Sequence, residues 1–212
     1  MPLVVHKKLP EQTQIGVWRV EENIEDLKKR LKLNEQELAF FDRLRKGKRN
    51  LHWLSSRVLI RNLLDTPEFI RLEGDEHGKP HLMNFDYELS ISHSFDYAAV
   101  IISKQKVGID IEYIKPKIEL IAHKFMSDQE LDTIHEEDRI KKMFVHWSGK
   151  ESLYKLHGKK DMVLKENILL EPFQYKEEGI VNAAICKNGK QLNVPIHYQE
   201  FNGYMFTYVI AK

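Results

Sequence analysis

The sequence predicts an α+β protein built from two similar lobes that are related by a rough two-fold axis. The first observation is an internal similarity at an offset of 94 residues, which aligns His52-Trp53 with His146-Trp147. The offset is close to half of the 212 residues. The second observation is that each of these segments is a helix pattern followed by strand patterns, which predicts an antiparallel sheet packed by helices in each lobe. We place the boundary near Gln105, with lobes at residues 1–104 and 105–212.

In the first lobe, apolar residues at three- and four-residue steps and capping signals indicate helices. Asn34 followed by Glu37 forms a capping box, which predicts a helix that continues through Leu44. The predicted elements are a strand at residues 15–20, helices at 24–33, 34–44 and 51–64 with a break at 46–49, a strand at 69–72, a turn at 75–80, and strands at 88–92 and 97–103.

The second lobe repeats this plan and ends in strands joined by tight turns. Asn188-Gly189 and Asn202-Gly203 are strong hairpin signals, so the last part of the chain should form an antiparallel meander. The predicted elements are a strand at residues 106–112, a helix at 118–125, a capped helix that begins at 127, a long helix at 140–155, and strands at 168–170, 173–176, 180–187, 195–201 and 204–211.

Composition and charge exclude several classes of protein. Lys and Arg together number 33 against 32 Asp and Glu, so no net field draws the chain to nucleic acid or to a membrane. The single cysteine, Cys186, excludes an internal disulfide and fits a reducing compartment. No apolar stretch approaches the length of a membrane span, and the N-terminus lacks the pattern of a signal peptide. We therefore expect a cytoplasmic protein.

One position of the long helix interrupts its apolar stripe. Continuing the stripe from Trp147 to Tyr154 places the carboxylate of Glu151 where the pattern requires an apolar side chain. Burial of an unpaired charge costs on the order of several kcal/mol, so this carboxylate needs a cation, a metal ion or water beside it. Lys155 lies one turn later, and the alternative to a functional site is an ordinary Glu–Lys pair at the edge of the helix.

The predicted strand at residues 106–112 carries two further carboxylates. The two-residue period of a strand places Asp110 and Glu112 on the same face. Adjacent carboxylates repel unless a cation or water screens them, and a solvated strand face is the simpler explanation for the strand alone. Together with Glu151, they would form an all-oxygen site of the kind that Mg²⁺ prefers. The ten histidines show no spacing typical of zinc ligands.

The first lobe supplies side chains suited to phosphate. In Gly78-Lys79-Pro80, glycine permits close backbone approach and proline rigidifies the turn that presents the lysine. Ser92-His93-Ser94 follows a strand pattern directly, so hydroxyl, imidazole and turn N–H groups can point at one anion. Arg57 adds a cation on the third predicted helix. Lys48 and Arg49 are more simply explained as solvated surface cations.

Five short segments follow one another along the chain: Gly78-Lys79-Pro80, Ser90-Ile91-Ser92-His93-Ser94, Gly108-Ile109-Asp110-Ile111-Glu112, Phe125-Met126-Ser127-Asp128-Gln129-Glu130 and Trp147-Ser148-Gly149-Lys150-Glu151-Ser152-Leu153-Tyr154-Lys155. In this order they resemble the motifs of the 4'-phosphopantetheinyl transferase family. The presence of both halves in one chain is similar to the two-lobed, monomeric Sfp type of that family rather than to its short trimeric type. Met126 stands where a second aromatic residue is commoner, and the arginine usual before the third helix has no unique counterpart.

The resemblance implies an enzyme that transfers the 4'-phosphopantetheine group from coenzyme A to a serine of an apo acyl or peptidyl carrier protein. Adenosine 3',5'-bisphosphate would be the second product. The resemblance implies that Asp110, Glu112 and Glu151 hold Mg²⁺, and that Lys155 contacts the diphosphate of coenzyme A and stabilises the leaving group. Carriers of fatty acid, polyketide and nonribosomal peptide synthesis are equally compatible with these residues.

The resemblance also implies roles for residues outside this acidic site. Lys79, Ser92 and His93 would bind the adenosine 3'-phosphate and neighbouring groups, with Arg57 joining them from the third helix. Glu130 stands where the family has a candidate general base for the serine proton. The capping box with Ser127 also explains Glu130 without a catalytic role. Glu151, acting through a water molecule, is the other candidate base. A non-catalytic module that binds coenzyme A or carrier proteins is the alternative function, and a Mg²⁺-dependent phosphohydrolase is a third.

Overall fold

The computed structural model describes residues 2–44 and 47–211. The chain divides into two compact units, one ending at Lys104 and the other beginning at Gln105. Each unit contains an antiparallel sheet packed by helices, which confirms the predicted α+β class. The two-fold relation between the lobes stays a prediction. Among the described helices, none is both long and apolar enough to span a membrane.

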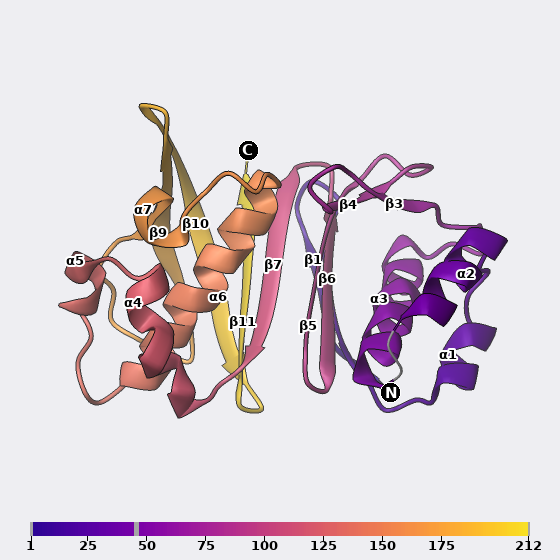
Figure 1. Ribbon diagram of the computed structural model, residues 1–212, viewed down its shortest axis with the longest axis horizontal. Helices are drawn as coiled ribbons and strands as arrows, with labels where there is room; N and C mark the ends of the chain where they lie inside the picture. Colours follow the sequence, from indigo (N-terminus) through magenta and orange to yellow (C-terminus); the bar gives the residue numbers. More distant parts are fainter. Residues whose placement is uncertain (1, 45–46, 212) are drawn as a thin grey trace. The chain divides into compact units, whose positions relative to one another are not determined.

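In the N-terminal unit, α3 packs on a four-stranded antiparallel sheet with the strand order β1-β2-β6-β5, and α1 and α2 lie on the side of α3 away from the sheet (Figure 1). The core between them contains Trp18, Leu59 and Val100. The elements are β1 (Leu3–Leu9), β2 (Thr13–Arg19), α1 (Ile24–Lys29), α2 (Glu35–Arg43), α3 (Lys48–Leu64), β3 (Leu72–Gly74), β4 (Pro80–Leu82), β5 (Glu88–Ser94) and β6 (Tyr97–Ser103).

In the C-terminal unit, a five-stranded antiparallel sheet has the order β7-β11-β10-β9-β8, and α6 runs along β7 and β11 on one face (Figure 1). The turns at Asn188-Gly189 and Asn202-Gly203 have positive φ at all four residues, which confirms the two predicted hairpins. The elements are β7 (Lys106–Tyr113), η1 (Pro116–Ile121), α4 (Ala122–Phe125), α5 (Asp128–Leu131), α6 (Arg139–His157), α7 (Leu164–Asn167), β8 (Ile168–Leu170), β9 (Glu178–Lys187), β10 (Lys190–Phe201) and β11 (Tyr204–Ala211).

The sequence predictions differ from the structure at four strands. The predicted strand at residues 69–72 is wrong, because only its last residue enters β3, and the one at 173–176 is a loop. Two strands are not predicted. One is β4, whose first residue ends the predicted turn at 75–80. The other is β1, in which an apolar side chain on the exposed face, Val4, and a lysine on the inner face, Lys7, obscure the two-residue period. Of the predicted break at residues 46–49, Lys46 lies outside the described residues. The break is wrong at Lys48 and Arg49, because α3 already begins at Lys48.

Close approach of α6 to β7 depends on a glycine. A Cβ atom at Gly108 would overlap the carbonyl oxygen of Ser152 and would lie 2.9 Å from the backbone nitrogen of Leu156. Both of these atoms belong to the backbone of α6, so neither can move without moving the helix. Glycine at position 108 therefore lets the helix lie directly on the strand that carries Asp110.

We expect Gly108→Ala to destabilise the protein by about 3 kcal/mol or more, because overpacking against backbone cannot be relieved by rotation of a side chain. Urea-induced unfolding followed by circular dichroism measures this loss. Gly74→Ala is the matched control, since the nearest heavy atom to its Cβ would lie at 3.8 Å. A Gly108→Ala variant as stable as the control would contradict the close contact between α6 and β7.

Candidate active site

Strand β7 presents two carboxylates to α6. Because side chains alternate along a strand and Gly108 faces α6, Asp110 and Glu112 face it as well. Asp110 is 3% exposed, and its Oδ1 lies 2.7 Å from the Nζ atom of Lys155. The same ammonium group donates a hydrogen bond of 3.1 Å to the carbonyl oxygen of Ile109. One end of the site is thus a buried aspartate paired with a lysine of α6.

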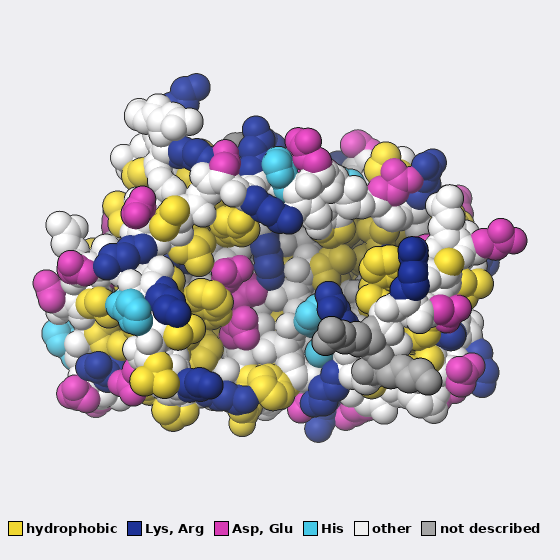
Figure 2. All heavy atoms as spheres, viewed as in Figure 1, with side chains coloured by type: hydrophobic (Ala, Val, Ile, Leu, Met, Phe, Trp, Pro, Cys, Tyr) yellow, Lys and Arg dark blue, Asp and Glu magenta, His cyan; other side chains and the backbone are white. Residues whose placement is uncertain are grey.

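Helix α6 adds a third carboxylate between two side chains that touch β7. Trp147, Glu151 and Lys155 follow one another at four-residue steps and so share one side of the helix. The indole N–H of Trp147 donates to Oε1 of Glu112 at 3.3 Å, and Lys155 pairs with Asp110. Figure 2 shows acidic side chains gathered over α6 and β7, beside a lysine or arginine.

The electrostatics of Glu151 indicate that it lies near Asp110. Burial raises the pKa of Glu151, the negative charge of Asp110 raises it further, and Lys155 acts in the opposite direction. A half-buried carboxylate beside a second carboxylate is stabilised by an added cation. The donor atoms here are carboxylate oxygens, which are the ligands that Mg²⁺ prefers.

Within the part of the chain that the structure describes, no group of three or more His, Cys, Asp or Glu side chains is arranged to hold a metal ion. Lys155 lies against Asp110, and Glu112 bonds to Trp147. The three predicted acids therefore lie on facing sides of β7 and α6, with the lysine and the indole engaging two of them. The residue types fit a hard divalent cation, and closure on such an ion requires these side chains to shift.

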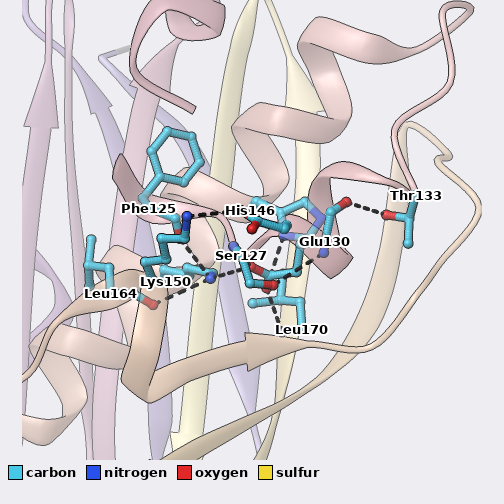
Figure 3. Close-up of polar contacts among 10 residues, drawn as sticks. Phe125, Ser127, Glu130, Thr133, His146, Lys150, Leu164 and Leu170 are labelled. Carbon is cyan, nitrogen blue, oxygen red and sulfur yellow. Dashed lines mark hydrogen bonds and ion pairs between the residues drawn. The ribbon is translucent and has the colours of Figure 1, made fainter. Parts of the chain in front are cut away.

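Glu130 belongs to a different, buried cluster, into which Lys150 and His146 project from α6 (Figure 3). Its Oε2 lies 2.7 Å from Nζ of Lys150 and accepts a hydrogen bond of 2.8 Å from the backbone N–H of Ser127. Its Oε1 accepts one of 2.9 Å from the backbone N–H of Leu170. The predicted capping box at Ser127 is confirmed, and the same carboxylate also joins α5 to α6 and β8.

The surroundings of Glu130 make it a poor proton acceptor. The residue is 4% exposed. Burial alone would raise its pKa, but the contact with His146 and the charge of Lys150 outweigh burial and lower the pKa to about 2. A carboxylate with such a low pKa, whose two oxygens both hold strong donors, binds a proton weakly at neutral pH.

The N-terminal unit holds the predicted phosphate ligands on two neighbouring elements. Lys79 follows the turn between β3 and β4, and its Nζ lies 4.0 Å from a carboxylate oxygen of Glu88, the first residue of β5. Ser92 and His93 lie near the other end of β5, where the His93 ring stacks on that of His52 at 4.5 Å between centroids. The stacking partner His52 was not among the predicted site residues.

Arg57 lies in a more enclosed position than a phosphate ligand requires. Its guanidinium stacks on the ring of Trp53 at 3.4 Å, and its Nε lies 3.5 Å from a carboxylate oxygen of Glu37. Burial lowers the pKa of Arg57 to about 10, although the charge of Glu37 opposes the shift. Arg57 thus already fastens α3 to α2 through a carboxylate and an aromatic ring.

Comparison with known proteins shows which family this chain is similar to. Residues 106–208 match the model of the 4'-phosphopantetheinyl transferase superfamily, and this segment contains all of β7 and α6. The chain is 31% identical over 155 residues to the 4'-phosphopantetheinyl transferase gsp of Aneurinibacillus migulanus, a match that covers 71% of this chain and 62% of that protein.

Two further relatives are shorter matches at higher identity. The 4'-phosphopantetheinyl transferase psf-1 of Bacillus pumilus is 35% identical over 115 residues, 50% of this chain and 49% of the relative. The 4'-phosphopantetheinyl transferase Sfp of Bacillus subtilis strain 168 is 37% identical over 94 residues, 42% of each chain. The chain thus spans less than two thirds of the length of each of these relatives. The resemblance to this family, predicted from the sequence, is confirmed.

Proposed function

We propose that this chain, whose residues 106–208 belong to the 4'-phosphopantetheinyl transferase superfamily, transfers the 4'-phosphopantetheine group from coenzyme A to a serine of an apo carrier protein. The observation that carries the proposal is the meeting of Asp110, Glu151 and Lys155 from β7 and α6, inside the segment that matches the family. In a partly buried site, two carboxylates can bind a divalent cation, and the cation and a lysine can together bind a diphosphate.

The proposed reaction forms a bond from the serine oxygen to the phosphorus that bears the pantetheine arm. It breaks the bond from that phosphorus to the bridging oxygen of the diphosphate. The serine proton passes to a base, and the departing electron pair stays on adenosine 3',5'-bisphosphate. Such a transfer depends on an in-line nucleophile and on neutralisation of charge at the bridging and leaving oxygens.

Asp110, Glu112 and Glu151 would hold Mg²⁺, since all three provide hard oxygen donors and face one another across β7 and α6. When bound, the ion would supply positive charge to the diphosphate oxygens. Lys155, which already lies beside Asp110, would contact the same diphosphate and stabilise the leaving group.

We assign removal of the serine proton to Glu151, acting through a water molecule. The half-buried Glu151 lies at the acidic site, whereas Glu130 is 4% exposed and paired with Lys150. In this proposal, Glu130 instead holds α5 and β8 against α6. The structural role gives Glu130 a reason to be a carboxylate without any part in the proton transfer.

For the adenosine 3'-phosphate we propose Lys79, Ser92 and His93 of the N-terminal unit. Lys79 sits beside β5, and Ser92 and His93 belong to that strand. We leave Arg57 out of this set, because its guanidinium is stacked on Trp53 and paired with Glu37. Coenzyme A and an apo acyl or peptidyl carrier protein are the proposed partners, and the protein is proposed to act as a cytoplasmic monomer.

The test is intact-mass spectrometry of a panel of apo acyl and peptidyl carrier proteins after incubation with the full chain, coenzyme A and Mg²⁺. We expect at least one carrier to gain the mass of one phosphopantetheine group. Carriers with the acceptor serine replaced by alanine, and reactions with a chelator in place of Mg²⁺, are the controls and should show no gain.

Three results would contradict the proposal. A folded protein that modifies no carrier but binds coenzyme A would indicate a binding module. Release of adenosine 3',5'-bisphosphate without carrier modification would indicate a phosphohydrolase, with water as the nucleophile. Equal mass gain with and without the chelator would remove Mg²⁺ from the reaction.

A further inference from the structure

A cluster of three buried hydroxyl groups joins α6 to β11. The Oγ1 atom of Thr207 lies 2.8 Å from the carbonyl oxygen of Ser148, 3.0 Å from the Oγ atom of Ser148 and 2.7 Å from the Oγ atom of Ser152. All three residues are 0% exposed. Within the part of the chain that the structure describes, this cluster contains no charged group.

The position of the cluster relates it to the acidic site. Thr207 is the direct cross-strand partner of Asp110 in the pairing of β11 with β7. Directly paired residues of antiparallel strands project from the same face, so Thr207 and Asp110 both face α6. On the helix, Ser152 follows Glu151 immediately, and Ser148 precedes it by three residues. One hydroxyl therefore connects the sheet beside one acid to the helical turn that carries another.

The hydrogen bonds of the cluster assign donor and acceptor roles to the Thr207 hydroxyl. Thr207 has one hydroxyl hydrogen, which it donates to the carbonyl oxygen of Ser148, so its Oγ1 acts as an acceptor toward the hydroxyl of Ser152. The Ser152 hydroxyl also lies 3.2 Å from the backbone carbonyl oxygen of Thr207, which is its second acceptor. A buried hydroxyl left without a partner is unfavourable, so the helix has a preferred height and rotation on the sheet. Gly108 permits the close approach of α6 to β7. The hydroxyl cluster then fixes the position and rotation of α6 on the sheet.

We propose that Thr207 is a positioning residue for the acidic site, whose buried hydroxyl holds the turn of α6 that carries Glu151 at a fixed place opposite Asp110. This inference rests on the proposed function, because it concerns the same site. Thr207 itself touches neither substrate nor metal. Its effect is on the distance and angle between two carboxylates that come from different elements.

The experiment measures binding of Mn²⁺, a paramagnetic probe of oxygen sites, to the full chain with coenzyme A by the electron paramagnetic resonance signal of free Mn²⁺. Thr207→Val keeps the shape of the side chain and removes the hydroxyl. Because groups that orient metal ligands affect affinity by roughly 10- to 100-fold, we expect the dissociation constant for Mn²⁺ to rise by that factor. Thr207→Ser keeps the hydroxyl and should restore binding.

Thr13→Val is the matched control. Thr13 is 1% exposed, and its Oγ1 lies 2.6 Å from the Oγ atom of Ser103 in the N-terminal unit. The substitution thus removes a comparable buried hydroxyl without touching α6 or β7, and it should leave Mn²⁺ binding unchanged. Should Thr207→Val fail to fold in circular dichroism, Ser152→Ala removes the same hydrogen bond from the helix side and should weaken binding in the same direction.

The outcomes separate this inference from the proposed function. Equal Mn²⁺ affinity for Thr207→Val and Thr13→Val, or no recovery with Thr207→Ser, overturns the positioning role. A wild-type protein that binds Mn²⁺ but modifies no carrier overturns the proposed function alone, and the binding series still decides the role of Thr207. A wild-type protein that binds no Mn²⁺ overturns both.

Discussion

Replacement of Glu151 by glutamine should lower the rate of carrier modification by about 100- to 10,000-fold, the range typical of lost acid–base groups. Glutamine keeps the shape of the side chain but can neither accept the serine proton through water nor add negative charge for a cation. Stability should not fall, because burial and the charge of Asp110 already disfavour the ionised form of Glu151 and raise its pKa. The rate of mass gain on a carrier and the thermal midpoint of unfolding measure the two effects.

Glu166→Gln is the matched control for this experiment. Glu166 is an exposed carboxylate on α7, so its neutralisation should change neither the rate nor the midpoint. A Glu151→Gln variant that modifies carriers at the rate of this control would remove Glu151 from the chemistry. A variant that loses activity together with its thermal transition would instead show that Glu151 is needed for folding.

The elements that carry the acidic site could be predicted from the sequence because their signals are local. The alternation around Asp110 predicts β7, and the apolar stripe around Glu151 predicts α6. The break in that stripe indicates a partnered carboxylate, and the structure places both Asp110 and Lys155 in its electrostatic surroundings. Lys155, however, forms its ion pair with Asp110, 45 residues away in sequence.

What the sequence could not predict depends on register and on contacts between distant segments. The proposed role of Thr207 depends on its pairing with Asp110. No local sequence pattern predicts which residues of two strands pair with each other. Gly108 is an ordinary strand glycine until the backbone of α6 lies against it. Arg57 has the spacing of a surface cation on α3, but stacking on Trp53 of the same helix and pairing with Glu37 of α2 enclose it.

The same limit explains Glu130. A capping box with Ser127 accounts for it locally, and the family resemblance suggests a base. The decisive neighbour is Lys150, which is 20 residues away and 0% exposed, and which donates to Glu130 at 2.7 Å and to the carbonyl oxygen of Phe125 at 2.8 Å. Burial lowers the pKa of Lys150, while the charge of Glu130 opposes that shift. The charge of Glu130 and the charge of Lys150 each offset the free-energy cost of burying the other.

Replacement of Lys150 by methionine should therefore destabilise the protein by about 3–5 kcal/mol, because it leaves the carboxylate of Glu130 buried without its cation. Urea-induced unfolding measures the loss. Lys165→Met is the matched control, since it breaks an exposed pair with Asp128 at 3.1 Å and should cost less than about 1 kcal/mol. Equal losses in the two variants would contradict the structural importance of the buried pair.

A double substitution then separates the two possible roles of Glu130. Glu130→Gln combined with Lys150→Met removes both charges, so it should be more stable than Lys150→Met alone. If Glu130 only fastens α5 and β8 to α6, the double variant should modify carriers at a rate close to that of the wild-type protein below its unfolding transition. If Glu130 is the base, the folded double variant should be as inactive as Glu151→Gln, because no carboxylate remains at position 130 to accept the proton.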